Sequence, residues 1–281
     1  MKASETSLQA IIEGAKQYVV PLFQRTYSWE KKEWEMLWND IDELGSEENP
    51  RGHFIGSIVT MPAASVPEGV PKYLLIDGQQ RLTTIFILLA ALRDNAKQCG
   101  QFRLAEEITN TLLVNPYLDG QNYYKLQPTQ VDREIFHNII NGGPITIAGR
   151  ISAAYQFFER KLKPENIDPA KVKNILTSKL SVVSIVLDPD DNPYLVFESL
   201  NAKGRPLTQS DLIRNYFFMR IHINEQEKTY LQYWKPMEDA LGDNLTEFIR
   251  HYLMKSGSVV KQSDVYFASG GLPYWFFQEY A

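Results

Sequence analysis

The sequence predicts an α+β protein, with a small sheet and a buried helix first and a mainly helical region afterwards. Strand-like segments at residues 18–21, 53–62 and 73–76 all precede residue 90. Later segments are mainly helical, apart from one alternating, β-branched stretch at residues 180–188. Strands gathered in one part of a chain and helices in another are typical of the α+β class.

The early elements each have a local signal. Ser7 predicts the N-cap of a helix over residues 8–13, and Ser28 predicts the N-cap of a second helix with apolar residues at helical spacing. The loop "ASVPEGVPK" between two strand-like segments predicts a hairpin with a variable tip. Residues 82–97 are apolar nearly all round, which predicts a buried helix. We expect this first domain to span residues 1–98.

The rest of the chain, residues 99–281, is expected to form a mainly helical domain. Thr208 and Asp211 make a capping box for a helix that begins around Gln209. The aromatic end shows no polar tail, so we expect the native chain to continue past residue 281. The other helical segments are expected near residues 102–113, 131–140, 151–162 and 170–178.

Composition narrows the classes of function. The net charge of −5, from 29 basic and 34 acidic residues, argues against a protein that binds nucleic acid over its whole surface. A local basic groove is still compatible with this net charge. The single Cys99 favours a reducing compartment. Without a signal peptide or a long apolar run, we expect a soluble cytoplasmic protein with no membrane partner. The four histidines show no metal-ligand spacing, and P-loop and G-x-G-x-x-G motifs are absent.

The densest polar cluster lies at the junction of a strand and the buried helix. It consists of Asp77, Gly78, Gln79, Gln80 and Arg81. The first N–H groups of a helix are unpaired and partly positive, so such a junction binds anions, phosphates above all. The arginine can fork onto phosphate, and the glycine lets a ligand approach the backbone. The aspartate could hold a divalent cation or position a water molecule.

A purely structural explanation of this junction is equally compatible with the spacing alone. Asp77 and Gly78 could form a tight turn, with Arg81 in an ion pair. The two glutamines favour a ligand, because a helix cap needs neither of them and buried polar side chains require partners. Thr83 adds a hydroxyl group in the first helical turn.

Two further motifs could contribute to the same site. Gln24 and Arg25 follow the first strand and could form part of a pocket wall. Asn201, Gly204 and Arg214 belong to the stretch "FESLNAKGRPLTQSDLIRNYF", where the asparagine and the arginine could reach a ligand. Turn formation, capping and core anchoring explain about half of the features of that stretch.

The motifs "PLFQRTYSW", "HFIGSIV", "IDGQQRLTTI" and "FESLNAKGRPLTQSDLIRNYF", in this order, resemble one family. It is the N-terminal domain of GmrSD-type, modification-dependent restriction endonucleases, shared with related phage-defence proteins. The resemblance implies a ParB/sulfiredoxin-like fold in which the D-G-Q-Q-R loop binds nucleotide phosphates. It also implies an NTP with Mg²⁺ as cofactor and modified DNA as a partner of the full system.

Carried over by position, the resemblance assigns residues to roles. Asp77, Gln79, Gln80 and Arg81 would be catalytic, with Asp77 also the metal ligand. The nucleotide-binding residues would be Gln24, Arg25, Gly78, Asn201, Gly204 and Arg214. We expect the Thr83 hydroxyl group in the first helical turn to join them. Full-length members usually end in an HNH-type nuclease domain, which this sequence lacks, so we expect DNA cleavage to need another domain or subunit.

We therefore expect a nucleotide-binding, weakly NTP-hydrolysing regulatory and DNA-sensing domain of a phage-defence restriction system. Two other functions compete with this one. A non-catalytic module could read modified DNA, stacking Tyr27 or Trp29 on an extruded base. A nuclease would need carboxylates, and beyond Asp77 the sequence offers only the stretch "DPDD" at residues 188–191.

Overall fold

The computed structural model describes residues 1–22, 24–46, 52–63, 69–163, 167–188, 191, 196, 208–218, 221, 223–255, 257, 259–261 and 265. The chain divides into two compact units. The first comprises Met1–Pro21 and Thr26–Asp191, and the second comprises Leu22–Arg25 and Asn192–Ala281.

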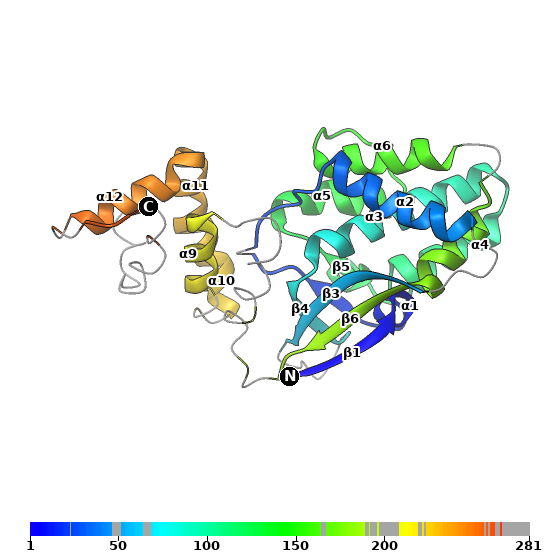
Figure 1. The fold of residues 1–281 in the computed structure, drawn as a ribbon, viewed down its shortest axis with the longest axis horizontal. Coiled ribbons are helices and arrows are strands. Elements are labelled where there is room, and N and C mark those ends of the chain that lie inside the picture. The colour runs from blue at the N-terminus through cyan, green and yellow to red at the C-terminus, as the bar shows by residue number, and fades with distance from the viewer. Residues whose placement is uncertain are drawn as a thin grey trace. The chain divides into compact units, whose positions relative to one another are not determined.

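Among the described residues, six strands form one mixed sheet in the first unit, in the order β1-β6-β3-β4-β2-β5 (Figure 1). Strand β4 runs antiparallel to β3 and parallel to β2, which is in turn parallel to β5. The strands are β1 Lys2–Ser7, β2 Gln17–Val19, β3 His53–Pro62, β4 Lys72–Asp77, β5 Leu126–Gln127 and β6 Leu180–Val186.

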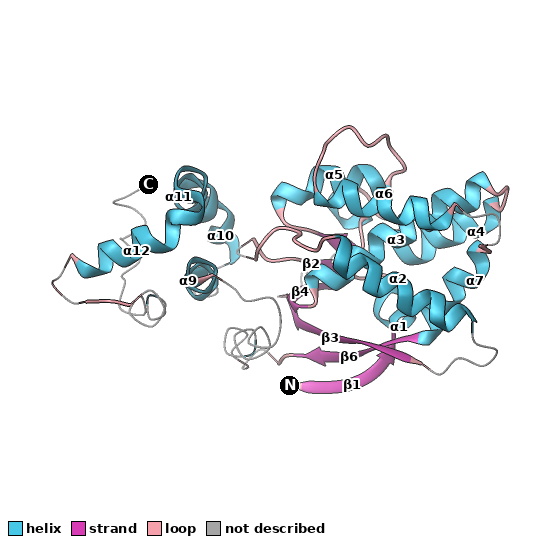
Figure 2. Ribbon diagram, turned by 45° about the horizontal axis from the view of Figure 1, so that its top comes forward, coloured by secondary structure: helices cyan, strands magenta, loops and turns pink. Residues whose placement is uncertain are grey.

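Helices gather on one side of this sheet, as Figure 2 shows for α2, α3, α5 and α6. Helix α3 is buried along nearly its whole length, as predicted, and lies at the centre of the core. The elements of this layer and of the sheet margins are α1 Leu8–Ile12, α2 Lys31–Ser46, α3 Gln79–Gln98, α4 Phe102–Glu107, η1 Ile108–Leu113, η2 Gly120–Tyr123, α5 Gln130–Ile140, α6 Arg150–Leu162, α7 Pro169–Asn174 and η3 Ile175–Lys179.

The second unit has a helical core of its own around Trp234, Phe218 and Ile249. The predicted capping box is present, because Thr208 N donates to Asp211 Oδ2 and Asp211 N donates to Thr208 Oγ1. Its helices are α9 Gln209–Phe218, α10 Ile223–Thr229, η4 Tyr230–Trp234, α11 Lys235–Leu241, η5 Gly242–Asn244 and α12 Leu245–Met254.

The α+β class is therefore confirmed, while some details differ from expectation. Helix α2 begins at Lys31 rather than next to Ser28, and the Glu33 carboxylate accepts from Glu30 N at its start. The boundary expected at residue 98 does not coincide with the division into units. Helix α3, on the early side of that boundary, packs against α4, α6 and α7 on the late side.

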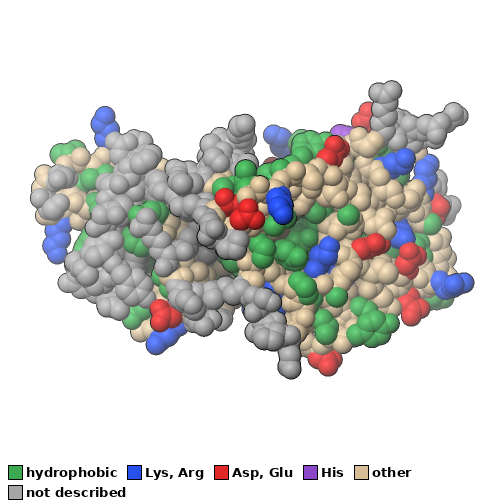
Figure 3. Space-filling model, turned by 90° about the horizontal axis from the view of Figure 1, so that it is seen from below, with side chains coloured by type: hydrophobic (Ala, Val, Ile, Leu, Met, Phe, Trp, Pro, Cys, Tyr) green, Lys and Arg blue, Asp and Glu red, His purple; other side chains and the backbone are tan. Residues whose placement is uncertain are grey.

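The surface fits the near balance of charges in the sequence. On the described part of the face in Figure 3, the first unit carries acidic and basic side chains side by side, without a continuous basic area. No helix within the described ranges is both long and apolar enough to cross a membrane.

Candidate functional site

The D-G-Q-Q-R cluster occupies the turn from β4 to α3. Asp77 ends the strand, and Gly78 has a φ of 89°, in the left-handed region that favours glycine. A Cβ atom on Gly78 would lie 2.9 Å from the Ser57 carbonyl oxygen of the neighbouring strand β3. A side chain at this position would therefore strain the backbone and press the turn away from the sheet.

The N-terminus of α3 has no side-chain cap among the described residues. The first backbone bond inside the helix runs from Leu82 N to Gly78 O, at 2.9 Å. A helix leaves its earliest N–H groups without intrahelical acceptors, and they carry a partial positive charge. The start of α3 can therefore receive hydrogen-bond acceptors from a ligand.

Arg81 adds a full positive charge beside this helix start. Its Nη1 donates to the Ser57 carbonyl oxygen at 2.6 Å. The guanidinium lies against Gly56, where a Cβ atom would come within 2.6 Å of Arg81 Cζ. Burial lowers the pKa of Arg81 and the charge of Asp77 opposes that change, but a guanidinium stays protonated in a protein.

The glycine that makes room for Arg81 lies at an irregularity of strand β3. Gly56 has a φ of 112°, and the pairing of β3 with β6 shifts register between Phe54 and Ser57. Neither Gly56 nor Ser57 was among the predicted site residues. The available signal was a glycine inside a strand-like stretch, which marks a bulge or a close approach to the backbone.

Asp77 is half-buried, and its Oδ2 accepts a long hydrogen bond of 3.4 Å from Ser57 Oγ. No group of three or more His, Cys, Asp or Glu that could hold a metal occurs among the described residues. The donor set therefore suits a hard cation only if phosphate oxygens and water complete its coordination around Asp77.

Gln80 has structural partners for both ends of its amide. Its Oε1 accepts from Ser28 N at 2.7 Å, and its Nε2 donates to Thr26 O at 3.1 Å. The side chain is 7% exposed, so it fastens the segment before α2 to the start of α3. Gln79, by contrast, is half-exposed.

The other predicted residues are distributed over both units. Thr83 is buried in α3. Gln24 and Arg25 group with the second unit, as does Arg214. Arg214 is 4% exposed and forms ion pairs with Asp211, at 2.7 Å, and with Glu238.

Four further residues that the sequence pointed to are not seen at the D-G-Q-Q-R loop. Asn201 and Gly204 lie outside the described residues. The carboxylates of Asp188 and Asp191 in the D-P-D-D stretch pair with the N-terminal amine of Met1.

Comparison with known proteins finds the same family that the sequence motifs resemble. The family model "GmrSD restriction endonuclease, N-terminal domain" matches residues 8–218. This chain belongs to that family. The match includes the D-G-Q-Q-R loop and Gly56 of β3, and ends with helix α9.

One relative of this GmrSD N-terminal domain is the uncharacterized protein MJ0686 of the archaeon Methanocaldococcus jannaschii. It is 25% identical over 235 residues, which cover 74% of this chain and 40% of the relative. The matched part thus covers well under half the length of that relative.

Proposed function

We propose that the loop at Asp77–Arg81 binds the phosphates of a nucleotide, as an NTP with Mg²⁺, in a modification-dependent restriction system. The observation that carries this proposal is the half-buried Arg81 guanidinium beside the uncapped start of α3. Both features stabilise an anion, and Gly78 supplies the left-handed conformation from which the helix begins.

Each residue of the loop has a distinct part in this proposal. The first N–H groups of α3 and Arg81 hold phosphate oxygens, and Asp77 holds the cation. A bound Mg²⁺ would neutralise charge on the phosphates. Gln79 is the better candidate for orienting a water molecule, because the amide of Gln80 is already engaged by Thr26 and Ser28.

The wider system is part of the same proposal. We further propose that the full system senses modified DNA and includes a nuclease domain or subunit. Gln24, Arg25, Thr83, Asn201, Gly204 and Arg214 remain proposed nucleotide-binding residues. Hydrolysis by this chain is proposed to be weak.

A thermal-shift titration tests nucleotide binding. We expect at least one of the four NTPs, added with Mg²⁺, to raise the melting temperature of the protein. Arg81→Ala is expected to abolish this rise. Lys97→Ala is a matched control, because Lys97 is an exposed cation in the last turn of the same helix. No rise with any of the four NTPs, or a rise that survives Arg81→Ala, would contradict the proposal. Release of phosphate measures hydrolysis separately.

The competing DNA-reading function has less support from the geometry. Tyr27 is 5% exposed, and its hydroxyl group bonds Thr84 Oγ1 and Trp34 Nε1, both at 2.7 Å. The ring therefore belongs to the core, and stacking on a base would rest on the half-buried Trp29. Binding to modified over plain DNA without NTP, followed over a range of salt, separates the two functions.

A further inference from the structure

A pocket of about 220 Å³ lies on the sheet, between helix α1 and strands β1, β6, β3, β4 and β2. Three of these strands contribute alternate residues to it, and their pairing places Ser4 opposite Ser184 and Thr60 opposite Val186. Paired residues of neighbouring strands point to the same face of a sheet. Pockets for drug-sized ligands measure roughly 300–1,000 Å³, so this smaller pocket suits one small chemical group.

Hydroxyl groups supply much of the polar lining of this pocket. They belong to Ser4, Thr6, Thr60, Ser184 and Tyr73. Within the described part of the chain none of these hydroxyl groups has a hydrogen-bond partner, although Thr60 is only 5% exposed. None of them is an enclosed polar atom without a partner, so a ligand in the pocket can reach them. Each can donate one hydrogen bond to an oxygen atom of a ligand.

Lys16 gives the pocket a positive charge, and no acidic side chain of the described residues lines it. The Nζ atom of Lys16 donates to Ala10 O at 2.9 Å, which leaves two N–H donors of the ammonium group. Burial lowers the pKa of Lys16, and the charge of Glu13 opposes that change only in part. An anion beside the ammonium group would offset this cost of burial.

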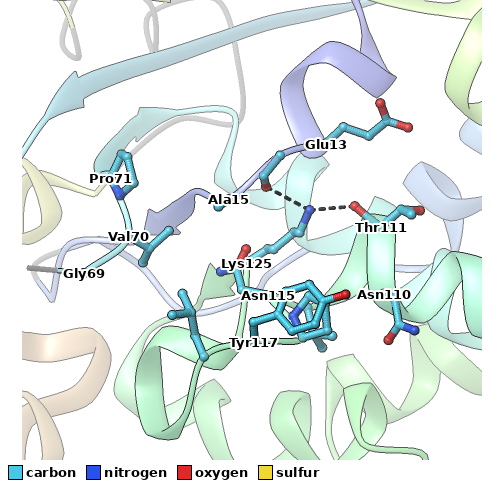
Figure 4. A pocket seen from close by; sticks show the side chains of 14 residues that line it. Glu13, Ala15, Gly69, Val70, Pro71, Asn110, Thr111, Asn115, Tyr117 and Lys125 are labelled. Atoms are coloured by element: carbon cyan, nitrogen blue, oxygen red, sulfur yellow. Dashed lines mark hydrogen bonds between the residues drawn. The ribbon is translucent and has the colours of Figure 1, made fainter.

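The nearby Lys125 differs from Lys16 because its hydrogen bonds are complete. It is 3% exposed, and its Nζ donates to Ile12 O at 3.1 Å, Gly14 O at 3.0 Å and Thr111 O at 2.6 Å. Figure 4 draws two of these bonds, in the wall of a larger pocket of about 600 Å³. An ammonium group has three N–H donors, so Lys125 has none left for a ligand. Of the two lysines, Lys16 is therefore the one that can hold an anion.

The donors of the smaller pocket come from several strands and from the segment before β2. A carboxylate offers two oxygen atoms in one plane, whereas a phosphate offers oxygen atoms in several directions and matches such a set of donors. Hydrogen bonds from a charged donor to an anion are also the stronger ones. We propose that this pocket binds a single phosphate group, as inorganic phosphate or a small phosphate monoester, with Lys16 and the strand hydroxyl groups as donors. The site is separate from the D-G-Q-Q-R loop.

An NMR titration with inorganic phosphate tests the site. It uses the Arg81→Ala protein, so that the D-G-Q-Q-R loop adds no phosphate binding of its own. At constant ionic strength we expect a Kd on the order of 1 mM for phosphate, and binding of chloride and acetate that is about tenfold weaker. No phosphate binding well above this concentration, or equal binding of chloride, would overturn the proposal.

Glycerol phosphate separates the two sources of the phosphate group. Binding as tight as that of inorganic phosphate, or tighter, identifies a small monoester as the ligand. Weaker binding identifies free phosphate.

Removal of the positive charge should have the largest effect on this site. We expect Lys16→Gln to weaken phosphate binding about tenfold or more. Lys72→Gln is the matched control, because Lys72 is a half-buried lysine next to the pocket residue Tyr73 in β4, and successive side chains of a strand point to opposite faces. This control should change the Kd by less than about twofold. Undiminished binding in Lys16→Gln would contradict the proposal.

A serine pair keeps the test decisive if Lys16→Gln also loses stability through its bond to Ala10 O. Ser184→Ala should weaken phosphate binding about fivefold, because one hydroxyl donor is lost. Ser181→Ala removes a hydroxyl group from the other face of the same strand and should leave the Kd unchanged. Equal Kd values for the two serine variants would count against this pocket.

The response to NTP shows whether the two sites are independent. Lys16→Gln, in the otherwise unaltered chain, is expected to keep the NTP-induced thermal shift. Loss of that shift would indicate one shared site and overturn a separate phosphate pocket. If NTP gave no shift in the unaltered chain while phosphate bound as described, only the nucleotide proposal would fail.

Discussion

The two ends of the same parallel strands differ in which helix ends they meet. At the carboxyl end of β4, helix α3 presents its N-terminus, with N–H groups that need acceptors. At the amino ends, α1 and η1 present their C-terminal carbonyl groups, which need donors. Each end contains one basic side chain bonded to a carbonyl group, the half-buried Arg81 in the first case and the buried Lys125 in the second.

The partners of each cation, rather than its charge, decide what its site can bind. Lys125 donates three hydrogen bonds to backbone carbonyl oxygens, so it stabilises the fold. Burial, with the nearby charge of Lys16, lowers its pKa to about 8, and the amine is still mostly protonated at pH 7. Arg81 donates one hydrogen bond to Ser57 O and lies beside N–H groups that also carry positive charge. This arrangement favours the binding of an anion.

Substitution by methionine gives the largest contrast between the two cations. Lys125→Met should lower the free energy of unfolding by about 2–4 kcal/mol, because buried carbonyl groups lose their donor. Arg81→Met should cost less in stability and abolish the NTP-induced thermal shift. Urea denaturation of both variants, with and without NTP, measures the difference. If the two variants lost similar stability and Arg81→Met still bound NTP, the distinction between a stabilising Lys125 and a ligand-binding Arg81 would be contradicted.

Gly56→Ala tests whether the position of Arg81 matters as well as its charge. The new Cβ overlaps the guanidinium and the backbone has a positive φ, so we expect a loss of about 1–3 kcal/mol together with a weakened NTP response. Gly100→Ala is the matched control, because Gly100 also has a positive φ but has no atom within 4 Å of an added Cβ. A normal NTP response in Gly56→Ala would show that the close packing is dispensable.

The two adjacent glutamines are predicted to separate stability from ligand response. Gln80→Glu puts a carboxylate against Thr26 O, so we expect a loss of about 1–2 kcal/mol. Gln79→Glu should leave stability within about 0.5 kcal/mol and weaken the NTP response through repulsion of phosphate. Denaturation midpoints and thermal shifts of the pair decide this; the reverse pattern would return the water-orienting role to Gln80.

Strong local patterns made much of the fold predictable. The strand expected at residues 53–62 coincides with β3, and the all-round apolar run became α3. Strand β1 was missed because its sequence, KASETS, is polar and exposed, and it exists through pairing with β6. Strand β5 has two residues, too few for any periodicity.

The candidate site was predictable where the residues are adjacent in the chain and unpredictable where they are distant. The D-G-Q-Q-R loop is one continuous stretch. Its contact with Gly56 depends on a bulge in another strand, which a sequence pattern does not place. Lys125 had no signal at all, because two of its carbonyl partners lie 113 and 111 positions away.

Acid should weaken the packing of α5 against β5. His137 stacks on Tyr124 with ring centroids 3.6 Å apart, and its Nε2 lies 3.0 Å from Gln127 Oε1 in β5. Burial, and then the charge of Arg133, lowers the pKa of His137 to about 4. The unfolded chain binds this proton near its ordinary pKa of about 6.5, so stability is complete above that pH and falls towards pH 4.

Since the ring is only partly buried, we expect this loss to be about 1 kcal/mol rather than the full value of the pKa difference. His137→Phe keeps an aromatic ring to stack on Tyr124 and removes the titration. Its stability, although lower at pH 7, should vary less between pH 7 and pH 4 than that of the unaltered chain. Denaturant midpoints measured across this range make the comparison. Equal pH dependence in the two proteins would place the acid-sensitive group elsewhere.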